Sequence, residues 1–231
     1  MKDQDLSILG TTGIFTGLRP NELSLVSQAA RTRRVESPGF FFMEQDPAGK
    51  MYILIEGRVR LHQVTPAGQQ VIMRYISPVE AFGVIAMLSE ITYPVSAQAV
   101  DDSTALYWDR ASIENLMGQI PRIAINGLQT LADRVREFQD RIRELTTERV
   151  ERRIARALLR LAQQTGRKVE QGVLVDLPIT RQDIAEITGT TIYTVSRTMS
   201  QWESQGIIKS GREKIIIRRP HQLVVIAEDL P

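Results

Sequence analysis

The chain has 231 residues and a formal net charge of +2 at pH 7, with 42% hydrophobic and 24% charged residues. This composition is typical of a folded protein of one or two compact domains and excludes a chain that is disordered throughout. Because the sequence contains no cysteine, it also excludes disulfides, thiolate metal sites, cysteine-ligated iron–sulfur clusters and cysteine nucleophiles.

The first ten residues carry no basic segment followed by an apolar core, so we expect no signal peptide. No apolar run in the sequence reaches the length of a membrane span. We therefore expect a cytoplasmic protein without a membrane partner.

The N-terminal part of the sequence predicts one short helix and then a series of strands. The apolar spacing of residues 23–30, after Pro20, favours the helix. Strand-forming segments bounded by proline and glycine turns follow at 51–55, 59–64 and 70–76. Strands of this length and spacing predict a small antiparallel barrel or sandwich.

A long helix with a heptad pattern is predicted after Pro121. Apolar residues recur at alternating spacings of four and three, as along the seam of a coiled coil: Ala124, Leu128, Leu131, Val135, Phe138, Ile142 and Leu145. Charged residues flank the seam, so the helix is not surrounded by apolar core. The pattern predicts a homodimer interface, and packing of the helix along its own barrel is the alternative. The predicted interface residues are Leu128, Leu131, Val135, Phe138, Ile142 and Leu145.

Basic charge is concentrated in the C-terminal part of the chain. Residues 149–219 contain fourteen Lys or Arg and seven Asp or Glu, whereas residues 1–148 contain fifteen and eighteen. Within this part, residues 150–164 form a basic amphipathic helix, which Gly166 ends. An excess of positive charge suits a polyanionic partner, and a solvated basic face is the simpler alternative.

The sequence from residue 180 onward has the pattern of two helices joined by a tight turn. Thr180 and Asp183 have the spacing of a capping box, which predicts a helix start. Gly189 permits the positive φ of an interhelical turn. A second helix begins near Thr191 and places apolar residues on its buried face, namely Val195, Met199 and Trp202.

A strand–turn–strand pattern around Ser210-Gly211-Arg212 follows the helix pair and predicts a wing. Its basic residues are placed to meet phosphates: Lys209, Arg212 and Lys214. The helix pair, the hairpin and the local basic charge together predict a winged helix-turn-helix that binds DNA.

The order of a small β-barrel, a long helix and a winged helix resembles the Crp/Fnr family of bacterial transcription regulators over nearly the whole chain. The stretch from Gly39 to Gly57, the Gly68 turn and Phe82-Gly83 are similar to the family's cyclic-nucleotide-binding-type β-roll, and Ile179–Arg197 is similar to its helix-turn-helix. The resemblance implies an α+β fold with a β-roll sensor or effector domain, a dimerisation helix and a winged helix-turn-helix domain, at 1–112, 113–147 and 148–231. It implies a transcription regulator that binds palindromic operators as a homodimer, with RNA polymerase as a further partner.

The resemblance also assigns residues that contact DNA. The family's second helix reads guanine through an arginine, which corresponds to Arg197, and Ser196 matches the Fnr-like pattern. A guanidinium offers two parallel donors to guanine O6 and N7. Ile192-Tyr193 departs from the family's acidic pattern, because Tyr193 has no carboxylate to accept from a cytosine amino group, whereas Ile192 is placed to touch a thymine methyl. The other predicted DNA-binding residues are Thr180, Arg181, Gln182, Thr191, Lys209 and Arg212. Of these, Arg181, Lys209 and Arg212 are expected to contact phosphates.

The predicted sensor domain departs from the family's cyclic AMP binders. Those binders place a glutamate after the cassette glycine and an arginine-serine pair some ten residues later, where this chain has Val84 and Tyr93-Pro94. The cation that would neutralise a cyclic phosphate is therefore missing, and we expect regulation by neither cAMP nor an iron–sulfur cluster. The expected effector pocket is formed by Phe82, Gly83, Val84 and Tyr93.

Several alternatives stay open at the level of the sequence. His62, in a predicted strand of the β-roll, permits a haem-based gas sensor, although a lone histidine on a strand is more often a packed or surface residue. A 2-oxo acid effector and effector-independent activity are further options. A ligand-gated regulatory subunit that docks on a protein partner is another. An enzyme is not expected, because the sequence has no P-loop or G-x-G-x-x-G motif and His62 and His221 lie far apart.

Overall fold

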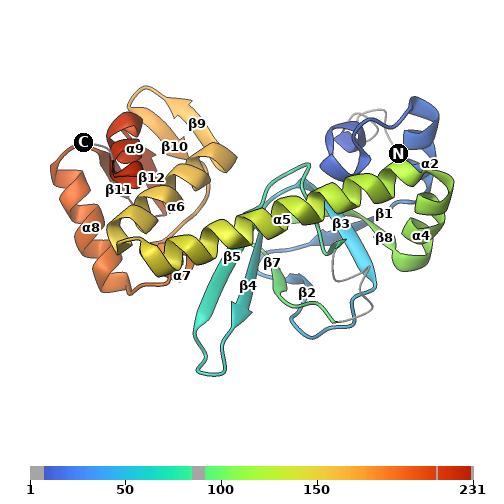
Figure 1. Cartoon of the computed structure of the whole chain (residues 1–231), viewed down its shortest axis with the longest axis horizontal. Helices are drawn as coiled ribbons and strands as arrows, with labels where there is room; N and C mark the ends of the chain where they lie inside the picture. Colours follow the sequence, from blue (N-terminus) through green and yellow to red (C-terminus); the bar gives the residue numbers. More distant parts are fainter. Residues whose placement is uncertain (1–7, 85–91, 212, 230–231) are drawn as a thin grey trace. The chain divides into compact units, whose positions relative to one another are not determined.

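A computed structural model of the chain describes residues 8–84, 92–211 and 213–229. The chain forms two compact units (Figure 1), one of the described residues up to 64 with residues 73–137, and one of residues 65–72 with those from 138 onward. The division falls inside α5 (Pro121–Thr147), whereas the sequence analysis placed domain limits at 112 and 147. The sequence pattern shows where a helix begins and ends, whereas the limits of a compact unit depend on which residues contact one another in the folded chain. Among the described helices, none is long and apolar enough to cross a membrane.

Strands β1 to β8 form two β-sheets, with strand orders β1-β8-β3-β6 and β2-β7-β4-β5. All lie in the first unit except the beginning of β5, residues 70–72. The pairings β1–β8, β3–β8, β3–β6, β2–β7 and β4–β7 are antiparallel. The predicted β-roll and the three predicted strands are therefore confirmed. The strands are β1 (Arg31–Val35), β2 (Phe40–Phe42), β3 (Lys50–Glu56), β4 (Val59–Val64), β5 (Gln70–Ile76), β6 (Ala81–Phe82), β7 (Ser96–Ala99) and β8 (Ser103–Asp109).

Strand β3 is buried on both faces and divides the core of this unit in two. Because successive side chains of a strand point to opposite faces, Met51 and Ile53 join one apolar cluster while Tyr52 and Leu54 join the other. The first cluster is completed by helical residues, and the second contains side chains from both sheets. The helical elements around the first cluster are η1 (Gly13–Phe15), α2 (Pro20–Ala29), α4 (Arg110–Gln119) and the start of α5.

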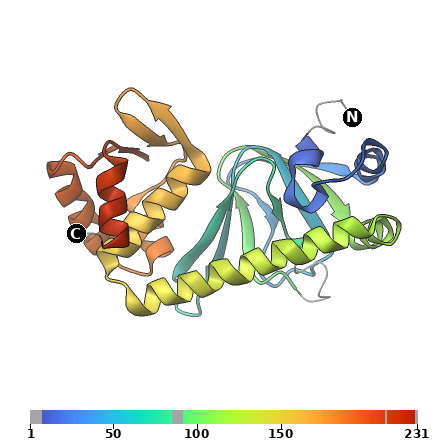
Figure 2. The same ribbon diagram turned by 45° about the horizontal axis from the view of Figure 1, so that its top comes forward.

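The second unit combines helices with one antiparallel sheet of order β11-β12-β10-β9. As predicted, α6 buries Ile154, Leu158 and Leu161 and ends before Gly166. Helix α9 lies alongside α6 (Figure 2). The elements are α6 (Val150–Thr165), β9 (Gly166–Val169), β10 (Gly172–Val175), α7 (Arg181–Thr188), α8 (Ile192–Ser204), β11 (Ile208–Gly211), β12 (Lys214–Ile217) and α9 (Pro220–Glu228).

Strands β9 and β10 and helix α9 were not predicted from the sequence. The two strands have four residues each, and β9 is mostly exposed, so neither shows a burial alternation long enough to be recognised. Helix α9 is stabilised from outside, because Arg152 Nε donates to Ala227 O at 3.3 Å, near the end of the helix. Tertiary contacts therefore define elements for which the local pattern is weak.

Candidate nucleic-acid interface

The start of α7 is fixed by a reciprocal capping box. Thr180 Oγ1 accepts from Asp183 N at 3.1 Å, and Asp183 Oδ2 accepts from Thr180 N at 2.7 Å. Such a pair satisfies two amides that the first turn of a helix leaves without partners. The predicted helix start is therefore confirmed, and Arg181 and Gln182 occupy the first two positions of α7.

Gly189 makes the turn between α7 and α8. Its φ is +61°, in the left-handed region that favours glycine. An added Cβ would lie 3.2 Å from Leu145 Cδ2, so a larger residue would be strained and also crowd α5. The predicted interhelical turn is confirmed, and it sets the direction in which α8 leaves α7.

Helix α8 separates a buried face from an exposed one. Thr191, a predicted DNA contact, is its N-cap and accepts from Thr194 N at 3.2 Å. The buried side contains Val195, Met199 and Trp202, as predicted. Tyr193 and Arg197 are exposed, and among the described residues Arg197 has no hydrogen-bond or ion-pair partner. The outer face therefore presents one free cation beside an exposed aromatic ring.

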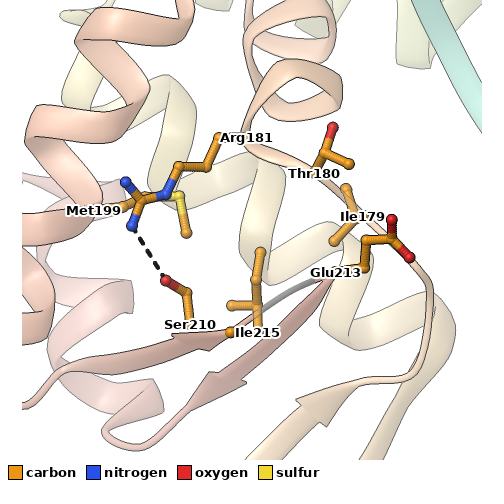
Figure 3. Close-up of a pocket in the computed structure, with 8 residues that line it drawn as sticks. Ile179, Thr180, Arg181, Met199, Ser210, Glu213 and Ile215 are labelled. Atoms are coloured by element: carbon orange, nitrogen blue, oxygen red, sulfur yellow. Dashed lines mark hydrogen bonds between the residues drawn. The ribbon is translucent and has the colours of Figure 1, made fainter.

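The wing, β11 with β12, is joined to both helices through Glu203. Glu203 Oε1 accepts from Ser210 N at 2.9 Å and from the Ser210 hydroxyl. Arg181 Nη2 donates to Glu203 Oε2 at 3.4 Å. It also donates to Ser210 Oγ at 3.3 Å, the bond drawn in Figure 3. One network thus holds together the start of α7, the end of α8 and the wing. Glu203 was missed from the sequence, because no local motif links it to Ser210.

A recess of about 230 Å³ lies beside this network (Figure 3). Its apolar lining consists of Ile179, Met199 and Ile215, and its polar lining includes Thr180, Arg181, Ser210 and Glu213. Two predicted DNA contacts, Thr180 and Arg181, therefore border a hollow between α7, α8 and the wing. Lys209 is exposed on the wing, while the predicted contact Arg212 lies outside the described residues.

The basic residues of α6 are engaged inside the second unit. Arg160 pairs with Glu144, and Arg156 pairs with Glu148 and Glu228 at 3.1 and 2.8 Å. Arg153 Nε donates to Thr188 O at 3.1 Å. These carboxylates lie just outside residues 149–219, so the predicted charge excess overstates the basic surface that is available to a partner.

The predicted seam of α5 lies at the surface. Leu128 and Ile142 are 67% and 62% exposed. The other four predicted interface residues are also exposed: Leu131, Val135, Phe138 and Leu145. Arginine–acid pairs three residues apart lie along the same helix, such as Arg134–Glu137 and Arg143–Asp140. Among the described residues, this apolar stripe is not covered by the chain itself.

Three of the four predicted effector residues, Phe82, Gly83 and Tyr93, lie together in one packed aromatic cluster, whereas Val84 belongs to the other apolar cluster of this unit. Tyr93 stacks on Phe42 with ring centroids 3.7 Å apart, and Phe82 stacks on Tyr52 at 5.0 Å. Tyr93 Oη donates to Lys50 O at 2.6 Å, and burial raises the pKa of Tyr93 to about 12. Val84 is buried, and residues 85–91 of the same segment lie outside the described residues.

The described part of this cluster is closely packed. Gly83 has φ +75°, and an added Cβ would lie 2.9 Å from Lys50 O, so the backbone is closely packed there. Arg33 reaches the cluster, but its guanidinium donates to Tyr52 Oη at 3.3 Å and to Phe40 O at 3.1 Å. The described residues therefore fill the space with aromatic rings, and this nearby cation is already engaged.

His62 is a buried residue of β4, 4% exposed. Its Nδ1 has no hydrogen-bond partner among the described residues, and its ring lies 6.2 Å from that of Phe40. Burial and the charge of Arg60 lower the pKa of His62. Within the described residues, no group of three metal-ligating side chains surrounds it. His62 is therefore a buried histidine of β4.

Two domain models match the chain in the order that the fold shows. Residues 32–119 match the cyclic nucleotide-binding domain, and residues 152–226 match the Crp-like helix-turn-helix domain. The cyclic AMP receptor protein of Thermus thermophilus is 29% identical over 214 residues, covering 93% of this chain and 96% of that protein. The CRP-like cAMP-activated global transcriptional regulator of Mycobacterium tuberculosis is 26% identical over 221 residues, covering 94% and 96%.

A solved structure agrees with these relatives. FixK2 from Bradyrhizobium japonicum has a TM-score of 0.76 and 26% identity, covering 85% of this chain and 96% of that chain. Both domain types, in this order and joined by a long helix, make the chain a member of the Crp/Fnr family of transcription regulators.

Proposed function

We propose that this regulator binds palindromic DNA operators as a homodimer, with α8 in the major groove. The observation that carries the proposal is the exposed guanidinium of Arg197, which the capped and glycine-turned helix pair holds at the surface. A guanidinium without an intramolecular partner can give two parallel hydrogen bonds to one guanine without first breaking an ion pair. RNA polymerase is the further partner that a transcription regulator of this family implies.

Selection of bound sequences from random duplex DNA tests this proposal. We expect a two-fold symmetric consensus with a guanine in each half and half-sites about one helical turn, roughly 34 Å, apart. Affinity should fall steeply with salt, because phosphate contacts release counterions. A docking module for a protein partner would select no sequence and would bind DNA weakly or not at all, which would reject the proposal.

The proposed dimer interface is the exposed seam of α5. A stripe of seven apolar positions at alternating spacings of four and three is the arrangement that two aligned helices bury together. Each fully buried leucine or phenylalanine contributes about 1.5–3 kcal/mol, so leaving six large seam side chains in water would be costly. A second copy of the same helix supplies a matching surface by symmetry.

Sedimentation of a seam variant tests the dimer. The double substitution Leu131→Asp and Phe138→Asp should give monomers, because it places four carboxylates in the paired seam. The control Gln139→Asp changes an exposed residue next to the seam and should leave the dimer intact. A double variant that sediments as the wild type would show that the interface lies elsewhere.

We also propose that operator binding does not require cAMP, although the names of the Thermus thermophilus and Mycobacterium tuberculosis relatives connect them with it. The packing of Phe82 and Tyr93 against other aromatic rings supports this. Operator affinity measured with and without cAMP should be the same. An increase in affinity with cAMP would contradict the proposal, and an absorption spectrum of the purified protein tests the haem alternative at His62.

A further inference from the structure

The first turn of α8 exposes two large apolar side chains next to each other. Tyr193 is 83% exposed, more than any other large hydrophobic side chain among the described residues, and Ile192 is 39% exposed. Within the described residues Tyr193 forms no hydrogen bond and no ring contact. Two adjacent exposed apolar side chains on a rigid helix form a surface that is available to a partner.

Helical geometry places Tyr193 beside Arg197. Residues four apart lie on one face, with Cβ atoms about 5–6 Å apart. The buried residues Val195 and Met199 occupy the opposite side, so Tyr193 and Arg197 share the centre of the exposed face. Since base pairs are stacked about 3.4 Å apart, the two side chains reach positions within about two base pairs of each other.

The chemistry of Tyr193 limits what it can read in the major groove. Its ring cannot accept a hydrogen bond from the amino group of cytosine, as a carboxylate would. The apolar group that a base pair presents in this groove is the C5-methyl of thymine. An exposed aromatic ring can discriminate bases by packing on that methyl, and the phenolic hydroxyl adds a group that can donate or accept a hydrogen bond.

We propose that Tyr193 determines operator specificity by contacting a thymine methyl within two base pairs of the guanine that Arg197 reads. This inference rests on the proposed DNA binding and adds which base is selected at the position that Tyr193 contacts. Ile192, which is partly covered, lies at the edge of the same contact. Ser200 is exposed on the same face two turns further on and presents no large apolar group, so it provides a matched control position.

Replacing thymine by uracil in the selected operator tests the proposal, because it removes the methyl and leaves base pairing unchanged. Burial of one methyl group corresponds to a loss of about fourfold in affinity per half-site, or roughly 15-fold when both half-sites are substituted. The wild type and Ser200→Ala should show this loss. Tyr193→Ala should bind the thymine and uracil operators equally.

Two further variants separate the ring from the hydroxyl. Tyr193→Phe keeps the ring and should retain the preference for thymine over uracil. If Tyr193→Phe loses this preference, the hydroxyl reads the DNA and the methyl contact is wrong. Tyr193→Glu introduces an acceptor for the cytosine amino group and should move the preference at this position from thymine to cytosine.

The outcomes distinguish this inference from the proposed function. If the protein selects an operator with a guanine that depends on Arg197, but uracil has no effect at any thymine within two base pairs of it, DNA recognition stands and the role of Tyr193 is rejected. If the protein selects no sequence at all, the proposed function itself fails, and the inference fails with it.

Discussion

Helices α6 and α8 lie in the same compact unit and both carry arginines, but they use them differently. The arginines of α6 donate to acceptors within the chain, such as Glu148, Glu144 and Thr188 O. The single arginine of α8, Arg197, has no partner among the described residues. The number of basic residues on a helix therefore does not tell how many of its cations are available to a partner.

Burial of the acceptors explains why the α6 arginines are structural. Glu144 and Glu148 have side chains only 6% and 8% exposed. A carboxylate at such a site is costly unless a cation or hydrogen-bond donor compensates it. Arg156 and Arg160 meet this requirement, and they also connect the end of α5 to α6 within the second unit.

The largest effect on DNA binding is expected for Arg197→Ala. Loss of a bidentate contact should cost about 1–3 kcal/mol per half-site and relax the preference for one guanine, because the lost hydrogen bonds go to a single base pair. The melting temperature should not change, since Arg197 has no described partner in the chain. Binding to the operator and to a guanine-substituted operator measures both quantities. An equal loss on both DNAs would make Arg197 a phosphate contact instead.

Arg156→Ala should lower the stability of the protein without changing base discrimination, which is the opposite of the effect expected for Arg197→Ala. Its removal leaves the buried Glu148 with only a long contact to Arg152, at 3.9 Å, and should lower the free energy of unfolding by about 1–3 kcal/mol. Base discrimination should remain that of the wild type. Glu228→Ala is the matched control, because it removes only the exposed partner of Arg156 and should cost less than about 1 kcal/mol.

Thermal unfolding and salt titration of DNA binding together decide the role of Arg156. If Arg156→Ala keeps the wild-type melting temperature but makes the salt dependence shallower, the distinction between α6 and α8 does not hold. In that case, α6 would also contact DNA.

The smallest effect is expected for Lys209→Ala on the wing. A lysine that meets a phosphate releases about one counterion, so the slope of log affinity against log salt should become shallower by about one per protomer. Discrimination between operator variants should not change, because phosphates carry no sequence information. Lys168→Ala changes an exposed lysine on β9, at the other edge of the same sheet, and should leave the slope unaltered. Equal slopes for Lys209→Ala and the wild type would remove the wing from the interface.

The parts of the fold that were predicted from the sequence depend on interactions between near neighbours. Thr180 and Asp183 are three residues apart, and the positive φ of Gly189 needs only the absence of a side chain. The strands of the β-roll and the heptad pattern of α5 are likewise periodicities of two and of three and a half residues. Each of these patterns lies within one helix, strand or turn, so it can be recognised from the sequence alone.

The tertiary structure alone decided which charges are free and which space is filled. Arg160 meets Glu144 across 16 positions, Arg156 meets Glu228 across 72, and Tyr93 closes on Lys50 across 43. The number of charges along the chain predicted a basic face on α6. Only the folded arrangement showed that the arginines of α6 are paired. Electrostatic and packing energies depend on distances in space. A linear sequence does not contain those distances until the fold brings remote residues together.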